Sequence, residues 1–78
     1  MKYLIVEDFS GQAVPFIFPR RVDHGDMREQ PPYSRVIAAG FVELGPQGFV
    51  CSGGNPELGL NARPGEDAAI IAEALRQR

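Results

Sequence analysis

One stretch near the C-terminus decides the fold of this 78-residue chain: Pro64-Gly65-Glu66-Asp67-Ala68-Ala69-Ile70-Ile71-Ala72-Glu73-Ala74-Leu75-Arg76. Pro64 suits the first position of a helix, where its missing N–H needs no partner. Acidic residues in the first turn and arginines at the end complement the helix dipole. The apolar residues recur at helical spacing as one stripe, made of Ala68, Ile71, Ala72 and Leu75 and widened by Ile70 and Ala74. The pattern predicts an amphipathic helix across one face of a sheet, so Ile71→Asp and Leu75→Asp should each unfold or severely destabilise the protein.

Five strands are expected ahead of this helix. Tyr3–Val6 is wholly apolar, which is typical of a strand covered on both faces. The next strand, over residues 13–18, should pair antiparallel with it at a sheet edge or carry a bulge, because Pro15 cannot donate to a ladder. Further strands are expected over residues 35–44, 49–52 and 57–61, with Gly40 marking a bulge or a close backbone approach. The predicted fold class is α+β: an antiparallel sheet of about five strands (β-β-loop-β-β-β) covered on one face by the C-terminal helix.

The segment between the second and third strands is the least regular. Asp23-His24-Gly25-Asp26 predicts one short helical turn that continues to Glu29, and Pro31-Pro32 would end it. Three apolar side chains are expected to hold this segment against the core: Val22, Met27 and Tyr33.

Length and composition indicate a single domain over residues 1–78. The apolar fraction of 44% fits a folded globule. Small domains bury a smaller share of their surface, and the lone Cys51 cannot close an intrachain disulfide, so oligomerisation is the expected support. Apolar strands with only one helix to cover them also need a second cover, which predicts a homodimer at micromolar concentration.

Several features bear on location and partners. No apolar run approaches the roughly 18 residues needed to cross a membrane. The N-terminus turns acidic too soon for a signal peptide, and a lone cysteine suits a reducing cytoplasm. Net charge is −2, and residues 19–35 sum to only +1, so direct nucleic-acid binding is not expected.

The chain has few of the side chains that usually form catalytic or metal-binding sites, because histidine, cysteine and lysine each occur once. No cofactor is expected. Asp23, His24 and Asp26 are possible metal ligands, but a solvated capping loop explains them better. Cys51 is a possible reactive thiol, yet its strand setting favours a small buried hydrophobe. The glycine-rich turns lack the strand–loop–helix setting of a phosphate loop, and core packing explains the aromatic residues better than base stacking.

Arginine supplies the strongest candidate for a binding site. Arg20, Arg21 and Arg28 cluster in the irregular segment after Pro19. A solvated loop is one reading of this cluster. The other is a recognition loop that projects from a rigid sheet, where arginine forms bidentate contacts and is over-represented among interface hot spots. These three arginines are the predicted partner-binding residues.

The whole chain also resembles a family of small proteins from phages, prophages and mobile elements of proteobacteria. The segments that carry the resemblance are Lys2–Asp8, Pro15–Pro19, Asp23–Met27, Ala38–Val42, Leu58–Leu60 and Ala62–Pro64. In size and origin such proteins are similar to anti-CRISPR proteins, which inhibit a CRISPR–Cas effector by binding it directly. Many anti-CRISPR proteins are strongly acidic mimics of DNA, and a net charge of −2 departs from that pattern.

The resemblance implies a non-enzymatic inhibitor that binds a host defence complex stoichiometrically in the bacterial cytoplasm. It assigns no functional residue. The alternative is a structural or accessory protein of a phage or mobile element with no inhibitory role. A small enzyme or ligand-binding domain is a third reading, which a deep polar pocket with convergent ionisable groups would favour.

Overall fold

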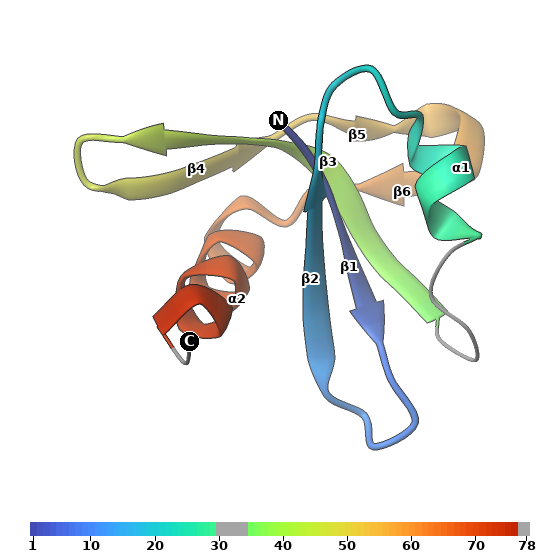
Figure 1. The fold of residues 1–78 in the computed structure, drawn as a ribbon, viewed down its shortest axis with the longest axis horizontal. Helices are drawn as coiled ribbons and strands as arrows, with labels where there is room; N and C mark the ends of the chain where they lie inside the picture. The colour runs from blue at the N-terminus through green and yellow to red at the C-terminus, as the bar shows by residue number, and fades with distance from the viewer. Residues whose placement is uncertain (30–34, 77–78) are drawn as a thin grey trace.

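The computed structural model describes residues 1–29 and 35–76, and it has the predicted α+β fold (Figure 1). Four antiparallel strands form the main sheet in the order β2-β1-β3-β4, and two short strands form a second sheet. The elements are β1 (Lys2–Glu7), β2 (Ala13–Phe18), α1 (His24–Arg28), β3 (Arg35–Gly45), β4 (Gly48–Ser52), β5 (Gly54–Asn55), η1 (Pro56–Leu58), β6 (Leu60–Asn61) and α2 (Pro64–Arg76). The predicted Pro31-Pro32 stop and the contact of Tyr33 lie outside the described residues.

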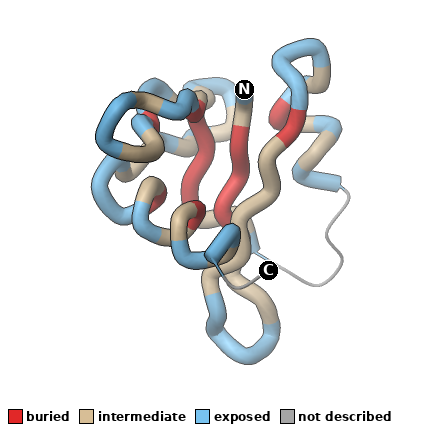
Figure 2. The backbone as a smooth tube through the Cα atoms, turned by 60° about the vertical axis from the view of Figure 1, so that its left-hand side comes forward, coloured by how far each residue is buried: buried red, intermediate tan, exposed pale blue. Residues whose placement is uncertain are grey.

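The N-terminal strand β1 lies in the middle of the molecule. It pairs with β2 on one side and with β3 on the other. Each residue from Tyr3 to Val6 is at most 2% exposed, and Figure 2 shows the buried residues concentrated along the inner strands. Because successive side chains of a strand point to opposite faces, a strand buried at every position must be covered on both sides. The prediction for this segment is confirmed.

Helix α2 covers one face of the sheet. Ile71, which is fully buried, packs into a cluster with Tyr3, Ile5, Ala38, Val42 and Cys51. The predicted burial of Leu75 on the apolar stripe is wrong, because Leu75 is 41% exposed. Asp67 is fully buried one turn before Ile71, so the inward face of the helix runs through these two residues and leaves Leu75 beside solvent.

The opposite face of the sheet has its own cover. Leu4, Phe18 and Ala39 form a second buried cluster, against which pack Val22, Met27, Val36 and Leu60. Residues from the predicted helical turn and from β6 therefore cover the face that α2 leaves open. The homodimer stays a prediction. The argument that a second copy must cover the open face of the sheet no longer supports it, because residues of the same chain cover that face.

Glycine and proline lie where the backbone needs them. Pro15 is in β2, an edge strand, as predicted. At Gly40, a Cβ atom would lie 2.5 Å from the carbonyl oxygen of Ser52 and 3.1 Å from Cβ of Ala62, which confirms a close approach. The expected strand over residues 57–61 is mostly a 3-10 turn, with only Leu60–Asn61 extended and paired outside the main sheet. The Asn55 side chain accepts from the Leu58 N–H at 3.2 Å and caps that turn.

Two variants on α2 test the orientation of the helix. Ile71→Asp places an unpaired charge in the core and should lower the free energy of unfolding by about 4 kcal/mol, enough to unfold a marginal domain. Leu75→Asp should cost only about 1 kcal/mol, because Leu75 is partly solvated. Thermal melts followed by circular dichroism measure both. Equal losses at the two positions would mean that the helix docks through a different face.

Candidate functional site

The first candidate site is a surface pocket around Arg20 on the face of the sheet away from α2. Arg20 follows β2, and its guanidinium carbon lies 5.5 Å from the centroid of the Phe41 ring. Its Nη2 atom lies 3.6 Å from Oε1 of Glu43. With Val50 and Ser52 these residues line a pocket of about 320 Å³. Strand pairing explains the grouping, since Phe41 pairs with Ser52 and Glu43 with Val50 across β3 and β4.

The three predicted arginines are therefore not one cluster. Arg20 is exposed, but its guanidinium lies over the ring of Phe41 and near the carboxylate of Glu43. Arg21 and Arg28 are both exposed, and Arg28 belongs to the last turn of α1. Among the described residues, no hydrogen bond or ion pair joins the three side chains. Of the three, Arg20 lines the pocket described above.

The end of the β3–β4 hairpin, residues 43–50, extends this surface, and we call it the hairpin arm. Leu44 is 76% exposed and Val50 58% exposed, although both belong to strands. Val50 lies on the Arg20 side of the sheet, and Leu44 lies on the other. Apolar side chains on a projecting hairpin, beside an aromatic ring and an arginine, match the composition of protein-binding surfaces.

His24 has a structural role. It is 3% exposed, and its ring packs edge-on against Phe18 and Phe41. Nε2 lies 3.0 Å from the carbonyl oxygen of Gly40, and Nδ1 lies 3.3 Å from the amide nitrogen of Asn55. In the tautomer that satisfies both contacts, Nε2–H donates to the carbonyl and Nδ1 accepts from the amide. Both ring nitrogens are thus used within the protein, and the described residues contain no metal-binding group of three or more such side chains.

Asp23 and Asp26 do not act with His24 as the metal reading requires. Asp23 precedes α1, but its carboxylate makes no capping hydrogen bond. It instead lies 4.0 Å from Nζ of Lys2, in an exposed pair that contributes little stability. The predicted helical turn is present, while its expected side-chain cap is not.

A buried polar group joins β1 to α2, and sequence reasoning missed it. The Tyr3 hydroxyl donates to Oδ2 of Asp67 at 2.5 Å. The same oxygen accepts from the Arg63 backbone N–H at 2.7 Å, and Oδ1 accepts from Arg63 Nε at 3.1 Å. Asp67 is fully buried, so these donors replace the water that its carboxylate would otherwise bind. One signal was available: Asp67 lies four residues before Ile71, on the apolar side of the helix.

Burial also raises the pKa values of two ionisable groups near Asp67, Tyr3 and Cys51. Burial, followed by the hydrogen bond to Asp67, raises the pKa of Tyr3 above its ordinary value of 10.0. Burial likewise raises the pKa of the Cys51 thiol, although the hydrogen bond with Tyr3 acts in the opposite direction. Cys51 is 4% exposed and belongs to the core cluster. These groups are held in their neutral forms, which suits packing better than nucleophilic chemistry.

Tyr3→Phe tests the buried hydrogen bond. At pH 7 the free energy of unfolding should fall by about 1–3 kcal/mol, because the Asp67 carboxylate loses a donor. A raised pKa means that the stability from Tyr3 is present below about pH 10 and is lost as the pH rises further, when the unfolded chain releases the proton first. The difference between the parent and Tyr3→Phe should therefore shrink between pH 9 and pH 11. Glu66→Gln, on an exposed neighbour, is the control and should change little.

Cys51 should resist thiol reagents in the folded protein. Its burial and raised pKa leave little accessible thiolate, so labelling by a disulfide reagent at pH 8 should be at least about a hundredfold slower than in the unfolded chain. Absorbance of the released thiolate measures both rates. Equal rates would show that β4 opens readily.

The described residues thus offer a pocket that holds Arg20, a hairpin arm with exposed aliphatic side chains and a buried polar group that holds α2. None of the described helices is both long enough and apolar enough to cross a membrane. Comparison of the chain with protein-family models, curated proteins and solved structures finds no match in any of the three.

Proposed function

We propose that this chain is a non-catalytic binding protein that blocks a surface of a partner protein, with Arg20 and the hairpin arm at the contact. The observation that supports the proposal is the pocket in which Arg20 lies over Phe41, beside the exposed Val50. Arginine and aromatic side chains carry much of the energy of known interfaces.

Charge bears on the kind of partner. Arg20 is paired with Glu43, so the pocket combines a positive and a negative group with apolar ones. A protein surface can complement such a mixture, whereas a phosphate backbone would be repelled by Glu43. From the resemblance to small phage proteins, we propose further that the partner is a CRISPR–Cas effector in the bacterial cytoplasm.

An interference assay in bacteria that carry an active CRISPR–Cas system tests this function. Expression of the chain should restore survival of a targeted phage, and inhibition of the purified effector should saturate near one chain per binding site. Arg20→Ala alone should weaken inhibition and effector pull-down at least about tenfold, since a hot spot typically contributes about 2 kcal/mol. The triple variant Arg20→Ala, Arg21→Ala and Arg28→Ala should lose as much or more, with a melting temperature within a few degrees of the parent.

Arg35→Ala is a matched control, because Arg35 is also exposed and pairs with an acidic residue, Glu7, at 3.2 Å. It should inhibit like the parent. An Arg20→Ala protein that binds and inhibits normally would show that the interface lies outside this pocket. Normal effector activity in the presence of the parent chain would exclude the inhibitory role and leave the structural or accessory one.

A further inference from the structure

The loop between β1 and β2 presents an aromatic side chain to solvent. Phe9 is 86% exposed, the highest value among the exposed large hydrophobic residues that the structure describes. Figure 1 shows this loop projecting from the end of the sheet, well away from the hairpin arm. The residue is thus a second exposed apolar feature, separate from the proposed effector-binding surface.

Hydrogen bonds within the loop fix its shape. Oδ1 of Asp8 accepts from the Ser10 N–H at 3.0 Å, from the Ser10 hydroxyl at 2.7 Å and from the Gln12 N–H at 2.9 Å. The Asp8 N–H also donates to the carbonyl of Gln12 at 3.0 Å, and Gly11 has the positive φ of 84° that closes the turn. Since the loop is ordered before binding, presenting Phe9 to a partner costs little further conformational entropy.

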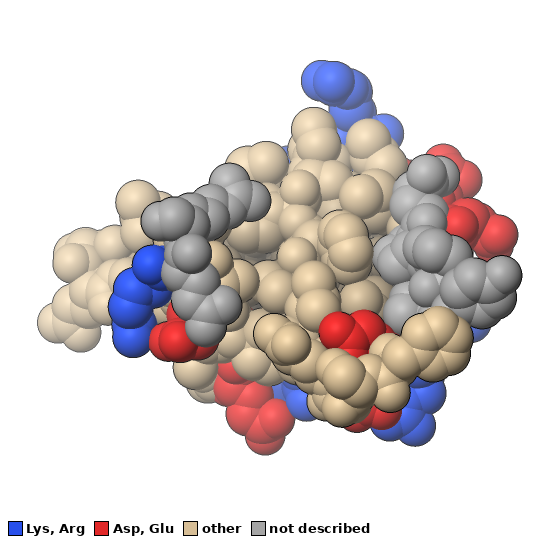
Figure 3. Space-filling model, turned by 60° about the horizontal axis from the view of Figure 1, so that its bottom comes forward, with Lys and Arg blue, Asp and Glu red and all other residues tan. Residues whose placement is uncertain are grey.

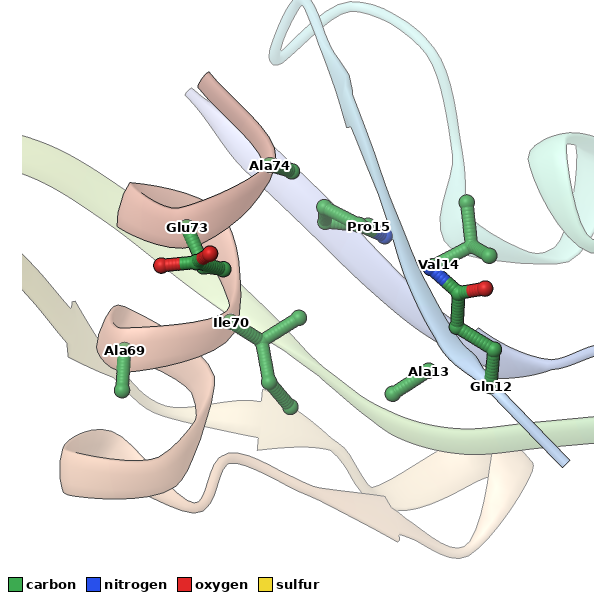
Figure 4. A pocket seen from close by; sticks show the side chains of 8 residues that line it. All are labelled: Gln12, Ala13, Val14, Pro15, Ala69, Ile70, Glu73 and Ala74. Atoms are coloured by element: carbon green, nitrogen blue, oxygen red, sulfur yellow. The ribbon is translucent and has the colours of Figure 1, made fainter. Parts of the chain in front are cut away.

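An apolar groove begins where this loop ends. It has a volume of about 640 Å³ and lies between β2 and α2. Figure 4 shows Ile70 reaching from α2 towards the strand that carries Ala13. The lining is Gln12, Ala13, Val14, Pro15, Ala69, Ile70, Glu73 and Ala74. A cavity of about 150 Å³ already holds benzene, so the groove has room for a phenyl ring.

We propose that the groove binds Phe9 of a second copy of this chain, and that the two copies exchange their Phe9 side chains in a two-fold dimer. A two-fold interface requires a projection and its complementary hollow on the same side of one molecule. The loop and the groove adjoin, because Gln12 belongs to both, and the proposal places them in one interface.

The charges favour this occupant over a nucleic acid or an anionic membrane. Among the described residues, those that line the groove include no basic one, and the acidic residue Glu73 is ion-paired with Arg76 at 3.0 Å. The carboxylate of Asp8 accepts hydrogen bonds from its own loop, and residues 9–12 carry no charge. Figure 3, which looks onto this end of the molecule, shows a broad area of uncharged side chains with an acidic group within it and other charged side chains near the edges. Insertion of Phe9 therefore buries no unpaired charge.

The size of the contact sets the expected strength. A stable interface buries about 800 Å² on each partner, against a total surface of 5180 Å² for this chain. A loop tip and one groove provide less than that. The dimer should therefore be in rapid exchange, with a dissociation constant in the micromolar range or weaker.

Sedimentation velocity of the purified chain from 5 to 500 µM tests the proposal. The parent should shift from monomer to dimer over this range. Phe9→Ala should raise the dissociation constant at least about tenfold, and so should Ala69→Glu, which places a charge on the exposed helix wall of the groove. Leu44→Ala, which removes a similarly exposed residue from the hairpin arm, is the matched control and should dimerise like the parent. Melting curves check that each variant is folded.

A disulfide locates the contact. When Ser10→Cys and Ala69→Cys chains of different tag length are mixed with a mild oxidant, the main product should join the two variants, since Cys51 is buried. A parent chain that stays monomeric at 500 µM, or a Phe9→Ala chain that dimerises like the parent, would overturn the proposal. The proposed function is tested separately, because Arg20→Ala should leave the dimer intact and Phe9→Ala leaves the Arg20 pocket unchanged.

Discussion

The fold depends on the contact between the Tyr3 hydroxyl and the Asp67 carboxylate. It connects the central strand to the first turns of α2, two segments that are 64 positions apart in the chain. Asp67 has no solvent exposure, so α2 can pack on the sheet only in the orientation in which Tyr3 and Arg63 supply its donors. A buried carboxylate without those donors would cost several kcal/mol, and this requirement selects one helix orientation among those that the apolar stripe alone would permit.

This long-range contact also separates the parts of the fold that the sequence predicts from those that it does not. Three elements carry a local signal and were predicted correctly. Residues 3–6 form an apolar run, the second strand contains the edge-strand residue Pro15, and the C-terminal helix has a helical periodicity. Asp67 was assigned to the helix dipole because an acidic residue in a first turn is already explained locally. Its partner is at the other end of the chain, where no local pattern could indicate it. The exposure of Leu75 follows from the same omission, because the position of Asp67 rotates the helix.

The candidate binding site was likewise predicted only in part. Sequence clustering identified Arg20, Arg21 and Arg28, but clustering along a loop does not tell which arginine contacts the sheet. The pairing of β3 with β4 places Phe41 and Glu43 under Arg20, and this depends on strand register rather than on the loop sequence. His24 shows the opposite case. Its neighbours in sequence suggested a capping loop or metal ligands, while its contacts with Gly40 and Asn55 make it part of the packing between α1 and the two sheets.

The central place of β1 has a consequence for synthesis on the ribosome. The strand is synthesised before two of the elements that pack on it, because β3 begins only at Arg35 and α2 only at Pro64. Its apolar side chains therefore wait for most of the chain to emerge before either face is covered. Domains with such distant pairings fold slowly, and their exposed strands are prone to aggregate in the interval. The nascent chain should thus be a substrate for chaperones that bind apolar segments at the tunnel exit, even though the finished protein hides those residues completely.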